Sequence, residues 1–239
     1  MIDPPERDTL PLARRALPGP GMVELWLTDL GRMPLGPDGI SDTLGPALKA
    51  RKLRQRFLLR LLLGAYLGRP GKAIRFVRNG HGKPALDAGG AQSPLEFNLS
   101  HSGSWLAVAV SRDVPVGVDI ENRRVLSRSL DLARRFLSEA EAAYLEALPE
   151  PRRSERFLEL WTQREALVKA MGQSLASALG ELALEPAEDG LRALPAAWPA
   201  MEQWSLLRGG LPPELLFAVA LPQAGFRLQT ILLDCTAGS

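Results

Sequence analysis

With 239 residues, of which 46% are hydrophobic, the chain can bury the core of one large domain or two small ones, which excludes disorder over its whole length. Its 29 basic and 27 acidic side chains leave a net charge of +2, so the overall balance indicates neither a nucleic-acid binder nor a membrane-surface protein. The single cysteine, Cys235, can form no internal disulfide, which favours the cytoplasm. No apolar stretch reaches the ~20 residues that span a bilayer, and residues 1–20 are predicted to form a flexible tail.

Strands and helices are expected to alternate after this tail. Strand patterns occupy four stretches, namely residues 22–30, 72–86, 97–111 and 116–122. One long helix is predicted over residues 47–67, and helices fill residues 127–172 apart from a proline-containing break at 148–151. Ser138 and Glu141 have the spacing of a capping box, so a helix is predicted to begin there. Short strands broken by prolines are expected in the remainder.

These elements predict an α+β protein with two similar halves. The stretch WLAVAV at residues 105–110 resembles LFAVAL at 216–221, and each follows a long helix that ends in glycine. We expect pseudo-symmetric halves at residues 21–113 and 114–239, each a small antiparallel sheet packed with a long helix. Sites commonly form where such halves meet, so the active site is expected at their interface.

Two acids on a predicted strand indicate a metal site. Asp119 and Glu121 are two residues apart, so both side chains lie on one face of the strand, roughly 6.6 Å apart. Carboxylate oxygens suit Mg²⁺, which takes one or two of them and completes its shell with water and substrate phosphates. Glu165 is a candidate third carboxylate and shares a helix face with Lys169, four residues on. The alternatives are an exposed strand end and an ordinary surface ion pair.

Hydroxyl, imidazole and basic groups predict a site for phosphates. Ser100, His101 and Ser102 precede Gly103 in a turn, where their donors can meet phosphate oxygens, although a purely structural histidine is an alternative. No Gly-x-Ser-x-Gly elbow surrounds these serines, which argues against a hydrolase triad. A predicted helix and a glycine-proline turn supply cations that either grip anions or form a solvated face: Lys49, Arg51, Lys52, Arg54, Arg56, Arg60 and Lys83.

Taken in order, these stretches resemble the 4'-phosphopantetheinyl transferases of the long, monomeric type that activates surfactin synthetase. The likeness runs from about Lys49 to Gly172. Five stretches carry it: the helix with Arg56, GKP at 82–84, FNLSHS at 97–102, GVDIE at 117–121 and WTQREALVK at 161–169. The resemblance implies transfer of the phosphopantetheine arm of coenzyme A to a serine of an apo acyl or peptidyl carrier protein, with release of adenosine 3',5'-bisphosphate. It also implies coenzyme A bound between two α+β halves.

The resemblance further implies how the acids would act. Asp119, Glu121 and Glu165 would hold Mg²⁺ against the pyrophosphate of coenzyme A. Lys169 would contact the same pyrophosphate and offset charge on the leaving phosphate. Glu165, or a water that it orients, would be the base for the carrier serine.

Nucleotide contacts follow from the same resemblance. His101 and Arg56 would bind the 3'-phosphate region, the Lys83 segment would lie along the adenine nucleotide, and Ser100 would assist through its hydroxyl or backbone. One position departs from the family, because Arg164 stands where a lysine is usual. We expect Arg164 to supply positive charge near the bound phosphates.

Two other functions fit parts of the pattern. A Mg²⁺-dependent nuclease or phosphohydrolase also uses three acids and a basic helix. A non-catalytic module that binds coenzyme A or a carrier protein would keep the fold without the chemistry. Nucleic-acid binding is disfavoured, since the basic run lacks interleaved aromatic residues. The prediction is therefore a cytoplasmic, monomeric transferase whose carrier belongs to a fatty-acid, polyketide or nonribosomal peptide synthase.

Overall fold

The computed structural model describes residues 4–33, 46–89, 93–178, 180–188, 190–211 and 215–236. Among these residues the first sheet has five strands in the order β1-β12-β2-β6-β5, namely Glu6–Thr9, Arg227–Asp234, Met22–Asp29, Trp105–Arg112 and Leu95–Ser102. A second sheet has the order β10-β11-β7, namely Ser205–Leu211, Leu215–Leu221 and Gly117–Asn122. Short two-stranded pairs are β3 with β4 (Phe76–Arg78, Pro84–Leu86) and β8 with β9 (Ala183–Leu184, Leu191–Ala193).

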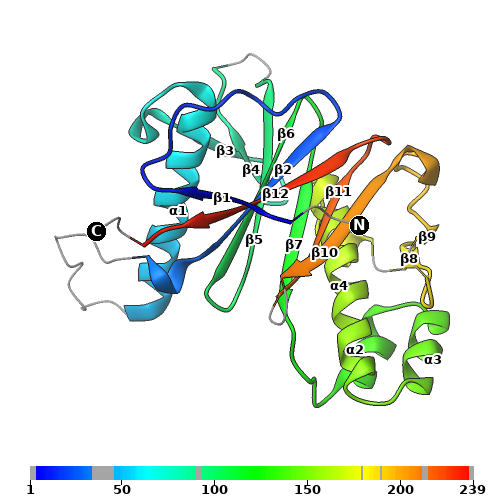
Figure 1. Ribbon diagram of the computed structural model, residues 1–239. Coiled ribbons are helices and arrows are strands. Elements are labelled where there is room, and N and C mark those ends of the chain that lie inside the picture. The colour runs from blue at the N-terminus through cyan, green and yellow to red at the C-terminus, as the bar shows by residue number, and fades with distance from the viewer. Residues whose placement is uncertain are drawn as a thin grey trace.

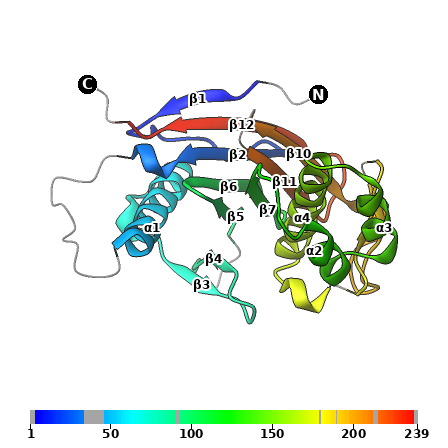
Figure 2. The same ribbon diagram turned by 90° about the horizontal axis from the view of Figure 1, so that it is seen from below.

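Two long helices lie on the same side of the sheets, with the β3–β4 hairpin between them (Figure 2). The long helices are α1 (Pro46–Leu67) and α4 (Arg152–Ala170), and the shorter helices α2 (Ser129–Phe136) and α3 (Glu139–Ala147) precede α4. Short 3₁₀ turns cover Leu30–Arg32, Gly71–Ala73, Leu175–Ser177 and Met201–Gln203. None of the helices in the described residues is long and apolar enough to cross a membrane. The predicted α+β class is confirmed.

Most predicted elements have close counterparts. The strand expected at 22–30 is β2 and the helix expected at 47–67 is α1, while the long helical region divides into α2, α3 and α4. Ser138 caps α3, since its side chain accepts from the backbone of Glu141 and the Glu141 carboxylate accepts from the backbone of Ser138. The predicted capping box is therefore confirmed, and the break at 148–151 falls between α3 and α4.

The two ends of the chain differ from the prediction, because both contribute strands to the first sheet (Figure 1). Residues 6–9, expected in a flexible tail, form β1 and pair in parallel with β12, and β12 pairs in parallel with β2. The first sheet is therefore mixed rather than antiparallel, and a strand from the second predicted half completes it. Side chains on both faces of β2 are buried, so its second backbone edge needs a partner, and β12 supplies one.

Apolar side chains from both sheets form one shared core. Val23, Leu25 and Leu27 of β2 pack with Val118 and Ile120 of β7 and with their neighbours. Separate clusters bury α1 against the first sheet and α2 to α4 against the second. Because close-packed cores resist shear, the shared cluster fixes the strand edges on which the site is built.

Candidate functional site

The two sheets meet where β5 runs beside β7, and alternate polar side chains of β5 join them. Asn98 accepts a hydrogen bond from the backbone of Val118 at 3.0 Å through its side-chain oxygen. Two residues on, the Ser100 hydroxyl donates to Asp119 Oδ1 at 2.6 Å. Since alternate residues of a strand share a face, the sequence FNLSHS presents this polar row to β7 while Phe97 enters the core.

The last member of the row, Ser102, holds the second acid. Its hydroxyl donates to Glu121 Oε2 at 3.0 Å and accepts from the backbone of Asn122 at 3.0 Å. Arg124 also donates to Glu121 Oε2, at 2.7 Å. Asp119 and Glu121 therefore lie on one face of β7, as their spacing predicts, and each is held by a serine of β5.

Helix α4 approaches β7 closely because residue 117 is glycine. A β-carbon there would overlap the carbonyl oxygen of Ala166 and the backbone nitrogen of Ala170. This close approach carries the Lys169 side chain to β7, where Nζ donates to Asp119 Oδ1 at 2.7 Å and to the Ser100 hydroxyl at 3.3 Å. Glu165 lies one turn earlier, with Oε2 4.0 Å from the Lys169 ammonium.

The acids influence one another electrostatically. Burial raises the pKa of Asp119, and the Lys169 ammonium opposes this shift. Burial also raises the pKa of Glu165; the Lys169 ammonium opposes this shift, and the charges of Asp119 and Glu121 add to it. The three carboxylates that the sequence singled out are thus near enough to repel one another.

This donor set suits Mg²⁺ in its chemistry, because all three candidates are carboxylates and the ion fills its shell with water and phosphate oxygens. Within the described ranges, however, no three His, Cys, Asp or Glu side chains are gathered closely enough to hold a metal ion. Asp119 is turned to Lys169 and Glu121 to Arg124. These two cations engage only one oxygen of each acid, so binding of Mg²⁺ by all three acids requires the carboxylates to move closer together.

A basic pair lies beside the acids, at the end of β5. Arg51 NH2 donates to His101 Nε2 at 3.1 Å, and because a guanidinium only donates, this ring nitrogen is the acceptor of a neutral imidazole. Burial, followed by the charges of Arg51 and Lys169, lowers the pKa of His101. Arg51 Nε is buried and has no hydrogen-bond acceptor in the part of the chain that is described. Such an unused donor beside an imidazole suits an anionic ligand.

Sequence reasoning counted Arg51 among the helix cations but selected Arg56 to act with His101. Arg56 instead lines a cavity of about 590 Å³ between α1, the β3–β4 hairpin, β5 and the C-terminal end of α4. The cavity also takes in Lys83, Glu165 and Lys169. Helical spacing alone does not tell which arginine meets a strand, so no signal in the sequence favoured Arg51. The side chain of Lys49 lies outside the described residues.

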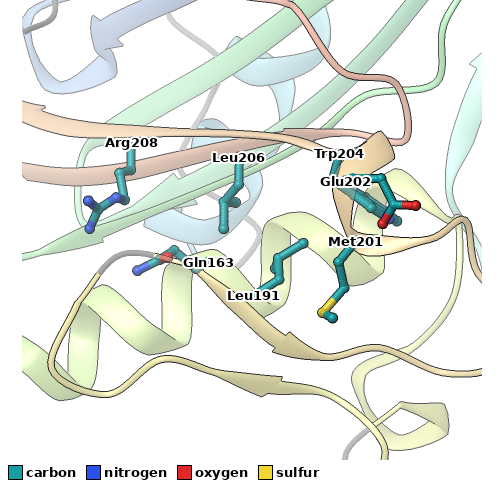
Figure 3. Close-up of a pocket in the computed structure, with 8 residues that line it drawn as sticks. Gln163, Leu191, Met201, Glu202, Trp204, Leu206 and Arg208 are labelled. Carbon is teal, nitrogen blue, oxygen red and sulfur yellow. The ribbon is translucent and has the colours of Figure 1, made fainter.

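A second cavity, of about 470 Å³, contains none of the predicted site residues. Figure 3 shows its lining, with Arg208 and Glu202 well separated and Leu206 and Trp204 between them. Gln163 reaches it from α4 and Leu191 from β9.

Arg164 is not near the predicted phosphate contacts, and that expectation is wrong. Its guanidinium is fully buried, pairs with Glu141 and donates to the carbonyl of Leu182. Glu141 is the residue that caps α3 with Ser138, and its other oxygen accepts from the backbone of Leu184 at 3.3 Å. Arg164 faces the core of the second sheet because one residue along a helix turns the side chain by about 100° away from Glu165.

Family models match two adjacent stretches of the chain. Residues 115–204 match the 4'-phosphopantetheinyl transferase superfamily, and residues 49–113 match the model described as 4'-phosphopantetheinyl transferase, N-terminal. The two ranges together include every predicted site residue. Their boundary falls between β6 and β7.

Curated proteins with the same activity in their names align with the chain. The 4'-phosphopantetheinyl transferase HetI of Nostoc sp. is 36% identical over 185 residues, which are 77% of this chain and 75% of that protein. The transferase psf-1 of Bacillus pumilus is 36% identical over 59% of this chain and 58% of its own length. The transferase Sfp of Bacillus subtilis is 34% identical over 49% of this chain and 50% of its own length. The latter two alignments span only half to three fifths of those relatives.

Proposed function

Because the chain belongs to the 4'-phosphopantetheinyl transferase superfamily, we infer that it is an enzyme that transfers the 4'-phosphopantetheine arm of coenzyme A to a serine of an apo carrier protein. The observation that carries this proposal is the grouping of Asp119, Glu165 and Lys169 beside the cavity between α1 and α4. The cavity is lined by cations on the α1 side and by Glu165 and Lys169 on the α4 side, as a substrate with several phosphates requires.

We propose that Asp119, Glu121 and Glu165 hold Mg²⁺, which when bound would neutralise charge on the pyrophosphate of coenzyme A. The support for this assignment is the shared face of β7 and the mutual repulsion of the three acids. Ser100 and Ser102 keep two of the carboxylates oriented through hydroxyl hydrogen bonds. Lys169 would exchange its contact with Asp119 for a pyrophosphate oxygen.

The proposed reaction transfers the phosphopantetheine group by substitution at one phosphorus atom of coenzyme A. The carrier serine oxygen forms a bond to the phosphorus that bears pantetheine, while the bond from that phosphorus to the bridging oxygen breaks. Adenosine 3',5'-bisphosphate leaves with the bridging oxygen. We assign Glu165, or a water that it orients, as the acceptor of the serine proton, because its carboxylate faces the cavity and its pKa is raised by burial. Lys169 offsets the charge that develops on the leaving phosphate.

The nucleotide end is proposed to lie toward α1 and the β3–β4 hairpin. His101 and Arg51 suit the 3'-phosphate, since the Arg51 guanidinium has an unused buried donor. Arg56 extends the same basic surface within the cavity. The segment containing Lys83 also lines the cavity, where we expect it to lie along the adenine nucleotide.

We further propose that the protein acts as a cytoplasmic monomer on acyl or peptidyl carriers. Cys235 is buried and forms no disulfide, in keeping with a reducing compartment. The proposed site takes its residues from one chain, so a second copy has no part to supply. Carriers of fatty-acid, polyketide and nonribosomal peptide synthases are all candidate substrates.

Intact mass spectrometry of apo carriers tests the proposal. Carriers from the three classes are incubated separately with the protein, coenzyme A and Mg²⁺, and at least one should gain the mass of one phosphopantetheine group. A carrier whose acceptor serine is replaced by alanine should gain nothing. Hydrolysis of coenzyme A without a carrier would identify a phosphohydrolase instead, and binding of coenzyme A without either reaction would identify a binding module.

A further inference from the structure

The β3–β4 hairpin of the first half reaches across the cavity to the C-terminal end of α4. At the end of its turn, the Lys83 ammonium donates to the carbonyl oxygen of Ala170 at 3.3 Å and to that of Val116 at 3.0 Å. Ala170 is the last residue of α4, and Val116 directly precedes β7. One side chain thus connects the hairpin, the helix that carries Glu165 and the segment that leads into the Asp119 strand.

Asn79, at the start of the same turn, makes a second connection. Its Oδ1 accepts from the backbone of His81 at 3.0 Å and of Lys83 at 2.8 Å, which orders the turn. Its Nδ2 donates to the carbonyl oxygen of Gly172 at 2.8 Å, beyond the end of α4. The two functions of this amide use different atoms, so they can be separated by mutation.

The end of α4 is a natural target for these donors. Gly172 has a φ of +64°, its backbone nitrogen donates to Lys169 and that of Gln173 donates to Val168, which together form a Schellman motif. The terminal carbonyls of a helix carry partial negative charge, so a cation placed there is stabilising. The Ala170 and Gly172 carbonyls, which lie beside this motif, are the two that Lys83 and Asn79 occupy.

The surroundings of Lys83 differ from those of a surface cation. Burial lowers the pKa of its ammonium to about 8, and Glu96 on β5 opposes that shift. An ammonium has three donors, and two of them are engaged with backbone carbonyls that belong to the fold. Two of the three donors are therefore used in contacts within the fold, at a residue that also lines the cavity.

From this geometry we propose that Lys83 and Asn79 are positioning residues, which fasten the β3–β4 hairpin to the C-terminal end of α4. The inference rests on the proposed function and gives the Lys83 side chain a role distinct from a direct contact with the nucleotide. Through the fastening, the wall that holds the nucleotide is kept in register with Glu165 and Lys169 on α4. Loss of the fastening loosens the cavity before any ligand is present.

The decisive measurement is hydrogen–deuterium exchange of the protein without coenzyme A. Lys83→Met keeps most of the apolar stem and removes the donors, while Asn79→Asp keeps the Oδ1 bonds of the turn and replaces the donor to Gly172 with an anionic oxygen that the carbonyl repels. Both variants should exchange faster at residues 79–83 and 168–174. Lys72→Met, at an exposed lysine of the same half, is the matched control and should leave exchange unchanged.

Steady-state kinetics provides the second readout. KM for coenzyme A should rise about tenfold in Lys83→Met, a change that corresponds to ~1.4 kcal/mol, because two charge-assisted hydrogen bonds that hold the cavity wall are lost. The value of kcat should fall much less, because Asp119, Glu165 and Lys169 remain in place. Lys83→Arg, which can still donate to both carbonyls, should restore most of the protection from exchange.

Two results would overturn the inference. A raised KM with unchanged exchange in the ligand-free variant would mean that the Lys83 ammonium binds the nucleotide directly. Wild-type rates of exchange and a wild-type KM in Asn79→Asp would mean that the hairpin is held without this fastening. Because Asn79 is exposed, this variant can be measured even if Lys83→Met does not fold. The proposed function is judged separately, by whether the wild-type protein modifies a carrier at all.

Discussion

Two ion pairs on the same helix differ in what surrounds them. Arg164 and Glu141 are both 0% exposed, and the carboxylate is also bonded to backbone groups at the start of α3 and in β8. Lys169 and Asp119 are 27% and 8% exposed, and Lys169 lines the cavity. The first pair joins parts of the fold, whereas the second borders the space where a substrate is proposed to bind.

The difference shows what exposure does to an ion pair. A pair buried in the core is closed to solvent and to ligands, so removing one member leaves the other as an unpaired charge in the core. A pair beside a cavity can exchange its partners for phosphate oxygens and a cation at little cost, because the ligand replaces each lost contact. Both pairs join a basic side chain of α4 to an acid, and the difference in burial gives the two pairs different roles.

The largest effect is expected from breaking the exchangeable pair. Asp119→Ala should lower kcat/KM by about 10³-fold or more, since it removes a proposed metal ligand and the partner of Lys169. Thermal unfolding should remain cooperative, because Lys169 is partly exposed and has Glu165 within 4.0 Å. Carrier modification followed by mass spectrometry gives the rate. Near wild-type turnover would show that the site is misplaced.

Breaking the buried pair should cost stability instead of activity. Arg164→Met should lower the free energy of unfolding by ~3–5 kcal/mol, because Glu141 would be left charged and unpaired in the core. Denaturant titration measures the loss. Under conditions where the variant is folded, kcat/KM should stay within about threefold of wild type, a difference of less than ~1 kcal/mol.

Replacing Arg164 by the lysine that is usual in the family tests the same comparison of the two ion pairs, with a smaller expected effect. Arg164→Lys keeps the charge, but the guanidinium reaches Leu182 and Glu141 through two separate nitrogens, NH1 and NH2, and lysine has only one, so we expect a loss of ~1–3 kcal/mol in unfolding free energy. If lysine instead changed KM for coenzyme A and left stability unaltered, Arg164 would act on the phosphates after all.

A further test concerns the basic pair beside the exchangeable one. His101→Ala should weaken binding of coenzyme A about tenfold more than binding of its analogue lacking the 3'-phosphate, equivalent to ~1.4 kcal/mol, because the imidazole is proposed to meet that phosphate. Titration calorimetry with both ligands measures the difference. Equal losses would reject the assignment.

The smallest expected effect is on pH dependence. Burial and the neighbouring cations lower the pKa of His101 in the free protein, and a bound phosphate dianion should raise it again. Since the bound state then holds the proton more tightly, affinity for coenzyme A should increase as pH falls below neutrality. His101→Ala should flatten this dependence, and an unchanged slope in the variant would show that another group takes up the proton.

Much of the site was predictable because it depends on local periodicity. Alternation on a strand was enough to place Asp119 and Glu121 on one face, and the four-residue spacing on α4 was enough to bring Glu165 and Lys169 together. The capping-box spacing of Ser138 and Glu141 predicted the start of α3. These relations extend over a few residues, so they hold wherever the elements pack.

Other contacts could not be predicted because they depend on which elements meet. Arg51 and Arg56 are both helix cations, and only the approach of α1 to β5 brings Arg51 to His101. Arg164 looked like its charged neighbours until α3 and β8 were found to bury it. Likewise, nothing local to β12 shows that it will lie between β1 and β2.

By itself the sequence determined the α+β class, the principal helices, the row of acids and serines, and the family to which the chain belongs. Backbone periodicity and residue chemistry suffice for these, since both act over short distances along the chain. Only the tertiary structure decided that Lys83 contacts the end of α4, that Arg51 pairs with His101, and that Arg164 is buried. Burial and contacts at long sequence separation arise from the packing of the whole chain, and they give side chains of similar charge different roles.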